Sequence, residues 1–139
     1  MLPEDILPAV LEWDERYKVG VESIDHAHQE LFTIVQRLHR LLSETHQDQW
    51  ACEQGIKYLK NYTIRHFADE EAYMEAIGFI GRTEHKLEHD KMRDEVIPRL
   101  ERHLEEEDYS PAAIQRFLNA CFIWLDKHII NKDRMIGRY

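Results

Sequence analysis

Cysteine, glycine and proline are scarce in this chain of 139 residues, which contains only two, five and four of them. Cys52 and Cys121 lie far apart in the sequence and outside any CxxC motif, so the chain indicates neither a disulfide framework nor a cysteine-based zinc site. We expect both to be reduced, buried thiols in a cytoplasmic protein. Good helix formers dominate the remaining composition, which favours an all-α fold.

Long apolar runs and an excess of basic residues are also missing. The longest apolar run covers residues 120–125, far short of the roughly 20 residues that span a bilayer. Residues 1–10 carry no positively charged segment, so we expect neither a signal peptide nor a membrane span. Lys and Arg number 18 against 27 Asp and Glu, and the net charge of -9 argues against a nucleic-acid partner.

The length of the chain sets its expected organisation. We expect residues 1–139 to form a single domain, because a chain of this size can bury a substantial core. Residues 1–22 contain two prolines and a glycine and predict an extended N-terminal arm. The aromatic residues Trp13 and Tyr17 should pack this arm onto the rest of the domain.

Four amphipathic helices are predicted after the arm. Ser23 can cap the first helix, and Asp48 can cap the second, because both residue types accept hydrogen bonds from free backbone N–H groups. Gly78 is placed to close the second helix, since glycine readily adopts the left-handed conformation that ends many helices.

The third and fourth helices have signals of their own. The third should start near Thr83, and Pro98 should end or kink it because proline lacks a backbone N–H and clashes with the preceding turn. Ser110 followed by Pro111 predicts the start of the fourth helix, since serine is a good cap and proline is favoured at the first helical position.

Seven candidate metal ligands lie on the apolar faces of these helices. Two pairs are four residues apart, a spacing that places both side chains on one face of a helix. Five imidazoles and two carboxylates exceed the four ligands that one zinc ion usually takes, and they suit two iron ions bridged by carboxylates. The candidates are His28, His66, Glu70, His85, His89, His128 and Asp133.

Each histidine also has an ordinary interpretation, because a single histidine on an apolar face is more often a hydrogen-bonded core residue than a ligand. Together the seven residues favour a metal, since burying so many polar groups without partners would cost about 1–3 kcal/mol each. We interpret the other four histidines, His26, His39, His46 and His103, as surface residues.

Asp133 fits the helical pattern least well. Its separation of five residues from His128 corresponds to about 140° around a regular helix, so the two side chains could not face one site. Either the helix ends near Asn131, or a wider turn is inserted, as happens at functional sites. Taken alone, Asp133 would be interpreted as a surface acid near the C-terminus.

These spacings resemble the hemerythrin family, and most closely its stand-alone bacterial members. The resemblance covers nearly the whole chain and includes all seven candidate ligands in order. It implies an up-down-up-down four-helix bundle, which agrees with the number of predicted helices. Further matching residues are Trp13, Tyr17, Val19, Gly20, Val21, Ile24, Asp25, Phe67, Glu71, Trp124 and Leu125.

The resemblance implies two iron ions as the cofactor. Their imidazole ligands would be His85, His89 and His128 on one ion and His28 and His66 on the other. Glu70 and Asp133 would bridge the two ions, together with an oxo or hydroxo group derived from solvent. The first ion then has six ligands and the second has five, which leaves one open position for O2.

The resemblance also implies a dry pocket around the bound O2. A pocket without proton donors slows the loss of bound oxygen as peroxide. Its walls would be Leu31, Phe67, Trp124, Leu125 and Ile130, all of which also have an ordinary interpretation as core residues.

We therefore expect a monomer that binds O2 reversibly, is not an enzyme, and stores O2 or delivers it to an O2-consuming enzyme. One alternative is an O2 or redox sensor that acts through a separate partner, since sensors of the family usually need an output domain. Another is a di-iron enzyme with peroxidase-like or iron-oxidising and storage activity. Ferritin-like di-iron proteins, however, use Glu-x-x-His motifs, and this chain contains none.

Overall fold

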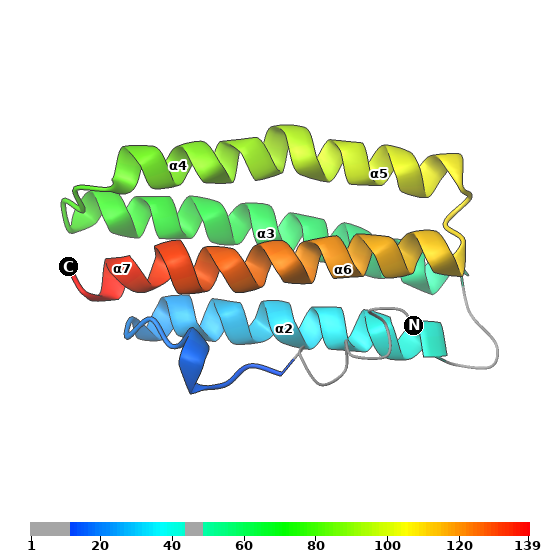
Figure 1. Ribbon diagram of the computed structural model, residues 1–139, viewed down its shortest axis with the longest axis horizontal. Coiled ribbons are helices and arrows are strands. Elements are labelled where there is room, and N and C mark those ends of the chain that lie inside the picture. Colours follow the sequence, from blue (N-terminus) through cyan, green and yellow to red (C-terminus); the bar gives the residue numbers. More distant parts are fainter. Residues whose placement is uncertain (1–11, 44–48) are drawn as a thin grey trace.

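The computed structural model describes residues 12–43 and 49–139, and this part of the chain forms four long helical rods without any strand (Figure 1). Successive rods run in opposite directions, which gives the up-down-up-down bundle expected from the sequence. The first two rods are α2 (Glu22–Ser43) and α3 (Gln49–Ala76). The third rod consists of α4 (Arg82–Lys91), η3 (Met92–Val96) and α5 (Ile97–Glu106), and the fourth of α6 (Pro111–His128), η4 (Ile129–Asp133) and α7 (Arg134–Gly137).

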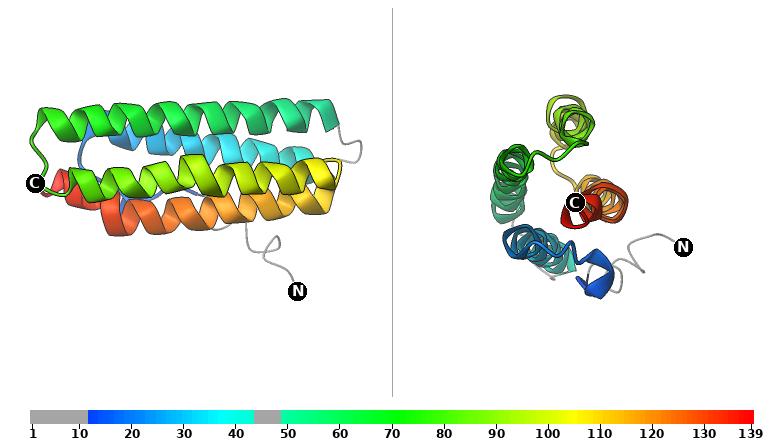
Figure 2. Two further views of the ribbon diagram at one scale, coloured as in Figure 1. Left: turned by 90° about the horizontal axis from the view of Figure 1, so that it is seen from above. Right: turned by 90° about the vertical axis from the view of Figure 1, so that its left-hand side faces the viewer.

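The rods enclose one elongated interior (Figure 2). Neighbouring contacts join α2 to α3, α3 to α4, α5 to α6, and α6 back to α2, so each rod touches two others. Buried aliphatic and aromatic side chains from all four rods form the core, and a smaller cluster of Phe67, Met92 and Ile97 lies beside it. No helix in the described ranges is long and apolar enough to cross a membrane.

The ends of the first two rods agree only partly with the sequence predictions. Helix α2 begins at Glu22, so Ser23 lies within its first turn and is not the cap. The Asp25 carboxylate instead accepts hydrogen bonds from the backbone N–H groups of Val19 (2.7 Å) and Gly20 (3.1 Å), which ties the arm to α2. The predicted closure of α3 at Gly78 is confirmed, since this residue has φ of 67° just after the helix ends. Asp48 lies outside the described residues.

The third and fourth rods show what proline does at two different positions. The start of α6 is confirmed, because Pro111 is its first residue and the Ser110 hydroxyl accepts from the Ala113 N–H at 3.2 Å. Pro98, by contrast, does not end the third rod. The rod passes through the wide turn η3 directly before Pro98, with the Ile97 N–H bonded to the Met92 carbonyl five residues earlier, and then continues as α5.

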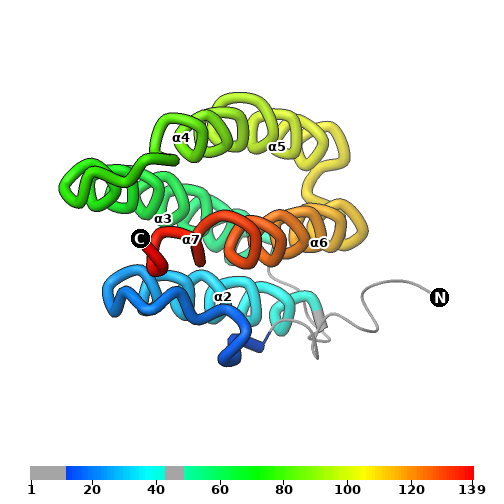
Figure 3. The backbone as a smooth tube through the Cα atoms, turned by 60° about the vertical axis from the view of Figure 1, so that its left-hand side comes forward, coloured from blue at the N-terminus to red at the C-terminus, as the bar shows by residue number. Residues whose placement is uncertain are grey.

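The described part of the arm packs against the bundle. Tyr17 is almost fully buried, its ring lies 4.8 Å from that of Phe32, and its hydroxyl donates to Asp126 at 2.6 Å. At the other end of the chain, a side chain added at Gly137 would collide with the Val19 carbonyl, so α7 lies directly on the arm (Figure 3). Neither cysteine takes part in a disulfide bond within the described residues, and Cys52 is buried and Cys121 partly buried.

Candidate metal centre

Every rod contributes at least one polar side chain to a single buried cluster. The i, i+4 spacing turns both members of each pair inward, on α3 and on α4. The cluster has almost no contact with solvent, since none of its members is more than 6% exposed. It contains His28 from α2, His66 and Glu70 from α3, His85 and His89 from α4, His128 from α6 and Asp133 from η4.

The wide turn η4 explains how Asp133 reaches this cluster. Its backbone closes with the Arg134 N–H bonded to the Ile129 carbonyl, five residues earlier. Such a turn takes up one extra residue, so side chains five apart come to the same face. Of the two alternatives that the sequence leaves open, the structure therefore has the wider turn, and Asp133 is 1% exposed.

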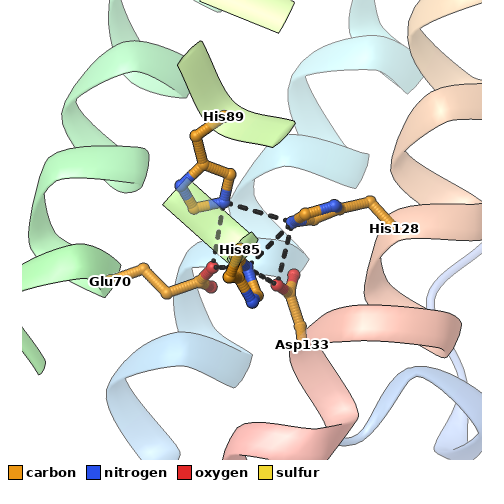
Figure 4. Close-up of side chains that lie close together, drawn as sticks. All are labelled: Glu70, His85, His89, His128 and Asp133. Atoms are coloured by element: carbon orange, nitrogen blue, oxygen red, sulfur yellow. Dashed lines mark hydrogen bonds and ion pairs between the residues drawn. The ribbon is translucent and has the colours of Figure 1, made fainter. Parts of the chain in front are cut away.

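Five of the ligand atoms surround one point (Figure 4). They are the Nε2 atoms of His85, His89 and His128, Oε1 of Glu70 and Oδ1 of Asp133, and six pairs among them are separated by 2.9–3.2 Å. With metal–ligand bonds of about 2.1 Å, ligands at right angles lie about 3.0 Å apart and tetrahedral ligands about 3.4 Å apart. The observed separations fit octahedral coordination better than a tetrahedral zinc site.

The other oxygens of the two carboxylates face a second group of atoms. Asp133 Oδ2 lies 3.0 Å from His28 Nε2, and Glu70 Oε2 lies 3.3 Å from His66 Nε2 and 3.7 Å from His28 Nε2. Both carboxylates thus belong to two groups of atoms that lie within 4.8 Å of one another, one with three imidazoles and one with two. Two metal ions could share both carboxylates in this arrangement.

Several of these atoms converge without making hydrogen bonds. Among the described residues, His28 Nε2, Glu70 Oε2 and Asp133 Oδ1 are buried and have no hydrogen-bond partner with suitable geometry. A buried polar group without a partner costs about 1–3 kcal/mol. Metal ions between these atoms would remove that cost, so the residues present fit the metals that the donor set indicates.

Without a metal, the imidazoles and carboxylates of the cluster shift one another's pKa values. Burial lowers the pKa of His28 and of His85, but the nearby carboxylates of Asp133 and Glu70 outweigh it and raise both values to about 9. Burial acts in the opposite direction on Glu70 and Asp133, yet the surrounding imidazoles hold the pKa of each carboxyl below its ordinary value. Metal binding must therefore displace protons from imidazoles.

Two further carboxylates, which the sequence patterns do not single out as ligand supports, hold the imidazoles from outside. The His89 Nδ1–H donates to Glu71 at 2.9 Å, and the His128 Nδ1–H donates to Glu88 at 3.2 Å. Lys132 of η4 also reaches Glu88, at 3.1 Å. Carboxylates in this position orient a histidine ligand and make it a stronger donor. Their only sequence signal is adjacency, since Glu71 follows one candidate ligand and Glu88 precedes another.

The aromatic residues of the expected O2 pocket lie against the imidazoles. Phe67 stacks on His89 with 4.0 Å between ring centroids, and Trp124 stacks on His128 at 4.3 Å.

Four of the five pocket candidates line one apolar cavity, namely Leu31, Phe67, Trp124 and Leu125. Ile130 does not line it and packs, partly buried, against the main core, whereas its neighbour Ile129 is fully buried.

The histidines expected at the surface lie away from the cluster. His26 and His103 are exposed and His39 is partly buried, while His46 lies outside the described residues.

Four antiparallel rods around a buried set of imidazoles and carboxylates define a metal-binding four-helix bundle. The family model described as the hemerythrin HHE cation binding domain matches residues 19–138. The chain belongs to the hemerythrin family.

Curated relatives cover most of the chain. A protein named bacteriohemerythrin from Clostridium acetobutylicum is 34% identical over 126 residues, which are 88% of this chain and 95% of the relative. A bacteriohemerythrin from Stenotrophomonas maltophilia is 29% identical over 91% of this chain and 78% of its own. A hemerythrin-like protein from Naegleria gruberi is 25% identical over 66% and 70%.

Proposed function

We propose that this protein binds O2 reversibly at a pair of iron ions. The observation that carries the proposal is the division of the cluster into two groups that share Glu70 and Asp133. In this proposal His85, His89 and His128 would hold one iron, His28 and His66 would hold the other, and Glu70 and Asp133 would belong to both groups.

The two groups offer different numbers of ligand atoms. The group with three imidazoles has five protein ligand atoms, whereas the group with two has four. The second group would therefore leave one more position on its metal ion for a small molecule. Bound iron would supply the electrons that O2 binding needs.

The apolar side chains near the centre then have to keep water and protons away from the position that a small molecule would occupy. We assign this role to Leu31, Phe67, Trp124, Leu125 and Ile130, none of which offers an acidic proton. His28 and His66 belong to the group with the open position, and both are buried, His28 completely. A dry surrounding of this kind favours release of O2 unchanged over its reduction.

The donor set supports a carrier over a di-iron enzyme. Ferritin-like di-iron centres depend mainly on carboxylates, whereas five of the seven candidates here are imidazoles. We propose O2 storage, or delivery to an O2-consuming enzyme, by a monomeric cytoplasmic protein that is not itself an enzyme. A sensor would use the same centre and would need a partner that reads its state.

Metal analysis and absorption spectroscopy test the proposal. Protein loaded with iron without air should hold two iron ions per chain, as the two ligand groups indicate. Air should produce a visible charge-transfer band that disappears when O2 is removed and returns in repeated cycles. Zinc-loaded protein is the control and should develop no band, because zinc does not change its oxidation state. A single metal ion per chain, or a band that never reverses, would contradict the carrier.

A further inference from the structure

A groove of about 530 Å³ runs along the surface between the third and fourth rods. The fourth rod lines it with Ile123, Trp124 and His128. Glu88 and Val96 line it from the third rod. Helix α5 packs on α6, whereas α4 packs mainly on α3. The fourth rod therefore leaves part of its face uncovered beside the metal centre.

The middle of the groove is apolar. Ile123 is 52% exposed, and its neighbour Trp124 is partly exposed. Ala120 on the same helix and Val96 across the groove add to this surface. Contiguous exposed apolar side chains with a polar rim are typical of surfaces that bind another protein.

The rim of the groove is basic on the side of the fourth rod. From residue 127 on, the chain has four basic side chains and one acidic side chain, Asp133, which is buried in the metal-ligand cluster. The basic residues are Lys127, Lys132, Arg134 and Arg138.

Most of these basic side chains are available to a partner. Lys132 is paired with Glu88 at 3.1 Å and lies 3.8 Å from Glu84, whereas the other three form no ion pair with a described residue. Lys127 is exposed and lines the groove. An acidic protein would be attracted here, although the chain as a whole, with a net charge of -9, would repel it.

The groove also leads to a metal-ligand candidate. Trp124 and His128 both line it, and their rings stack with 4.3 Å between centroids and 13° between planes. The imidazole of His128 is only 4% exposed, so a partner in the groove would reach it through the ring of Trp124.

The position of His128 in the cluster indicates what could pass along this route. His128 belongs to the group with three imidazoles, whereas the open position for a small molecule is expected in the group with His28 and His66. Contact at His128 therefore suits the transfer of electrons better than the transfer of a small molecule.

We propose that this groove is the docking site of a small acidic one-electron carrier protein, which reduces the metal centre through Trp124 and His128. That the centre is a pair of irons rests on the proposed function, whereas the docking of an acidic protein does not. O2 that leaves as peroxide takes two electrons and leaves both irons ferric. Each reduced carrier loses one electron and one ferric ion becomes ferrous, so two carriers restore the pair.

A plant-type [2Fe–2S] ferredoxin is the probe, because it is a small acidic protein that carries one electron. Isotope-labelled, zinc-loaded protein mixed with ferredoxin at low salt should show changed amide NMR signals at Ile123, Lys127 and Asn131, which line the groove. High salt should reverse the changes, because salt screens exposed charges. Changes on another face, or none, would overturn the docking site. Changes at the groove when the protein alone is concentrated would assign it to a second copy and overturn the proposal too.

Charge reversal tests the basic rim. Lys127→Glu should weaken ferredoxin binding about tenfold at low salt. The matched control is Lys57→Glu, because Lys57 is also an exposed helical lysine but lies on α3 and does not line the groove. This control should bind ferredoxin like the wild type. Equal weakening by both variants would show that only net charge matters and would overturn the docking site.

Stopped-flow reduction of the ferric protein without air tests the electron route. With reduced ferredoxin, reduction should be about tenfold slower for Lys127→Glu and several-fold slower for Trp124→Leu, whereas Trp124→Phe keeps a ring and should stay near the wild-type rate. Dithionite, a small reductant, should reduce Lys127→Glu as fast as the wild type.

The outcomes separate the two proposals. Wild-type rates with ferredoxin in both Lys127→Glu and Trp124→Leu would overturn the electron route even if ferredoxin docks. If Trp124→Leu folds poorly, Lys127→Glu still decides. Ferredoxin docking at the groove of a protein that never takes up O2 reversibly would support the docking site and contradict the proposed function.

Discussion

Removing the metals should leave a protein whose stability falls as the pH rises. In the metal-free chain the pKa of His28 and of His85 rises from 6.5 to about 9, because the attraction of the buried carboxylates outweighs the effect of burial. An unfolded chain has no such contacts and titrates near the ordinary value. Between these two values the unfolded chain has lost protons that the folded chain retains, so linkage favours unfolding as the pH increases.

The size of the effect follows from the same values. A rise from 6.5 to about 9 corresponds to about 3 kcal/mol for one histidine, at 1.36 kcal/mol per pKa unit. This stabilisation is complete below pH 6.5 and is lost as the pH passes through about 9. His28 and His85 share the same two carboxylates, so together they contribute less than twice this value. One kcal/mol moves the Tm of a domain of this size by about 3–5 °C, so the loss is about 10 °C.

Thermal unfolding of chelator-treated protein, followed by circular dichroism, measures this directly. The Tm should fall between about pH 6 and about pH 9.5. The stabilisation by bound metal should grow over the same range, because metal binding requires neutral imidazoles. His28→Gln should weaken the pH dependence, and the control His103→Gln, at an exposed position on α5, should preserve it. A metal-free Tm that stays constant or rises with pH would refute the reasoning.

Three comparisons between variants test separate parts of the centre. Glu70→Ala removes a candidate ligand from both groups and His28→Ala removes one from a single group, so Glu70→Ala should lose more iron in metal analysis; full iron content in both would contradict the assignment. Glu88→Gln should lower metal affinity by about 10–100-fold in competition with a chelator, and Glu84→Gln, which is exposed and 3.8 Å from Lys132, should not. Ile130→Ala should keep both irons but shorten the lifetime of the oxygenated form in stopped-flow spectra, and Ile130→Asn should shorten it further; unchanged decay would make Ile130 a packing residue only.

The helices and the paired candidates are predictable because they depend on local spacing. Residues four apart share a face in any regular helix, so His66 with Glu70 and His85 with His89 could be paired from the sequence. The start of α6 at Pro111 is equally local, since its signal lies in Pro111 and the capping residue Ser110.

Features that depend on the packed bundle could not be predicted. The position of Asp133 required a choice between a helix end and a wide turn, which only contacts between rods decide. The same is true of Pro98, whose local tendency to break a helix is relieved by the wide turn before it. Glu71 and Glu88 resemble many other acidic residues on helices, and only their distances to imidazoles distinguish them.

The two wide turns set a limit on redesign of this bundle. Each adds one residue to a helix and so rotates everything that follows it by about 100° relative to a regular helix. Idealised backbones omit such turns, because designers prefer regular helical geometry. A redesign that straightened the third and fourth rods would turn Ile97 and Asp133 out of the interior while keeping every side chain in the sequence. It would lose a buried apolar side chain and a shared carboxylate without a single substitution.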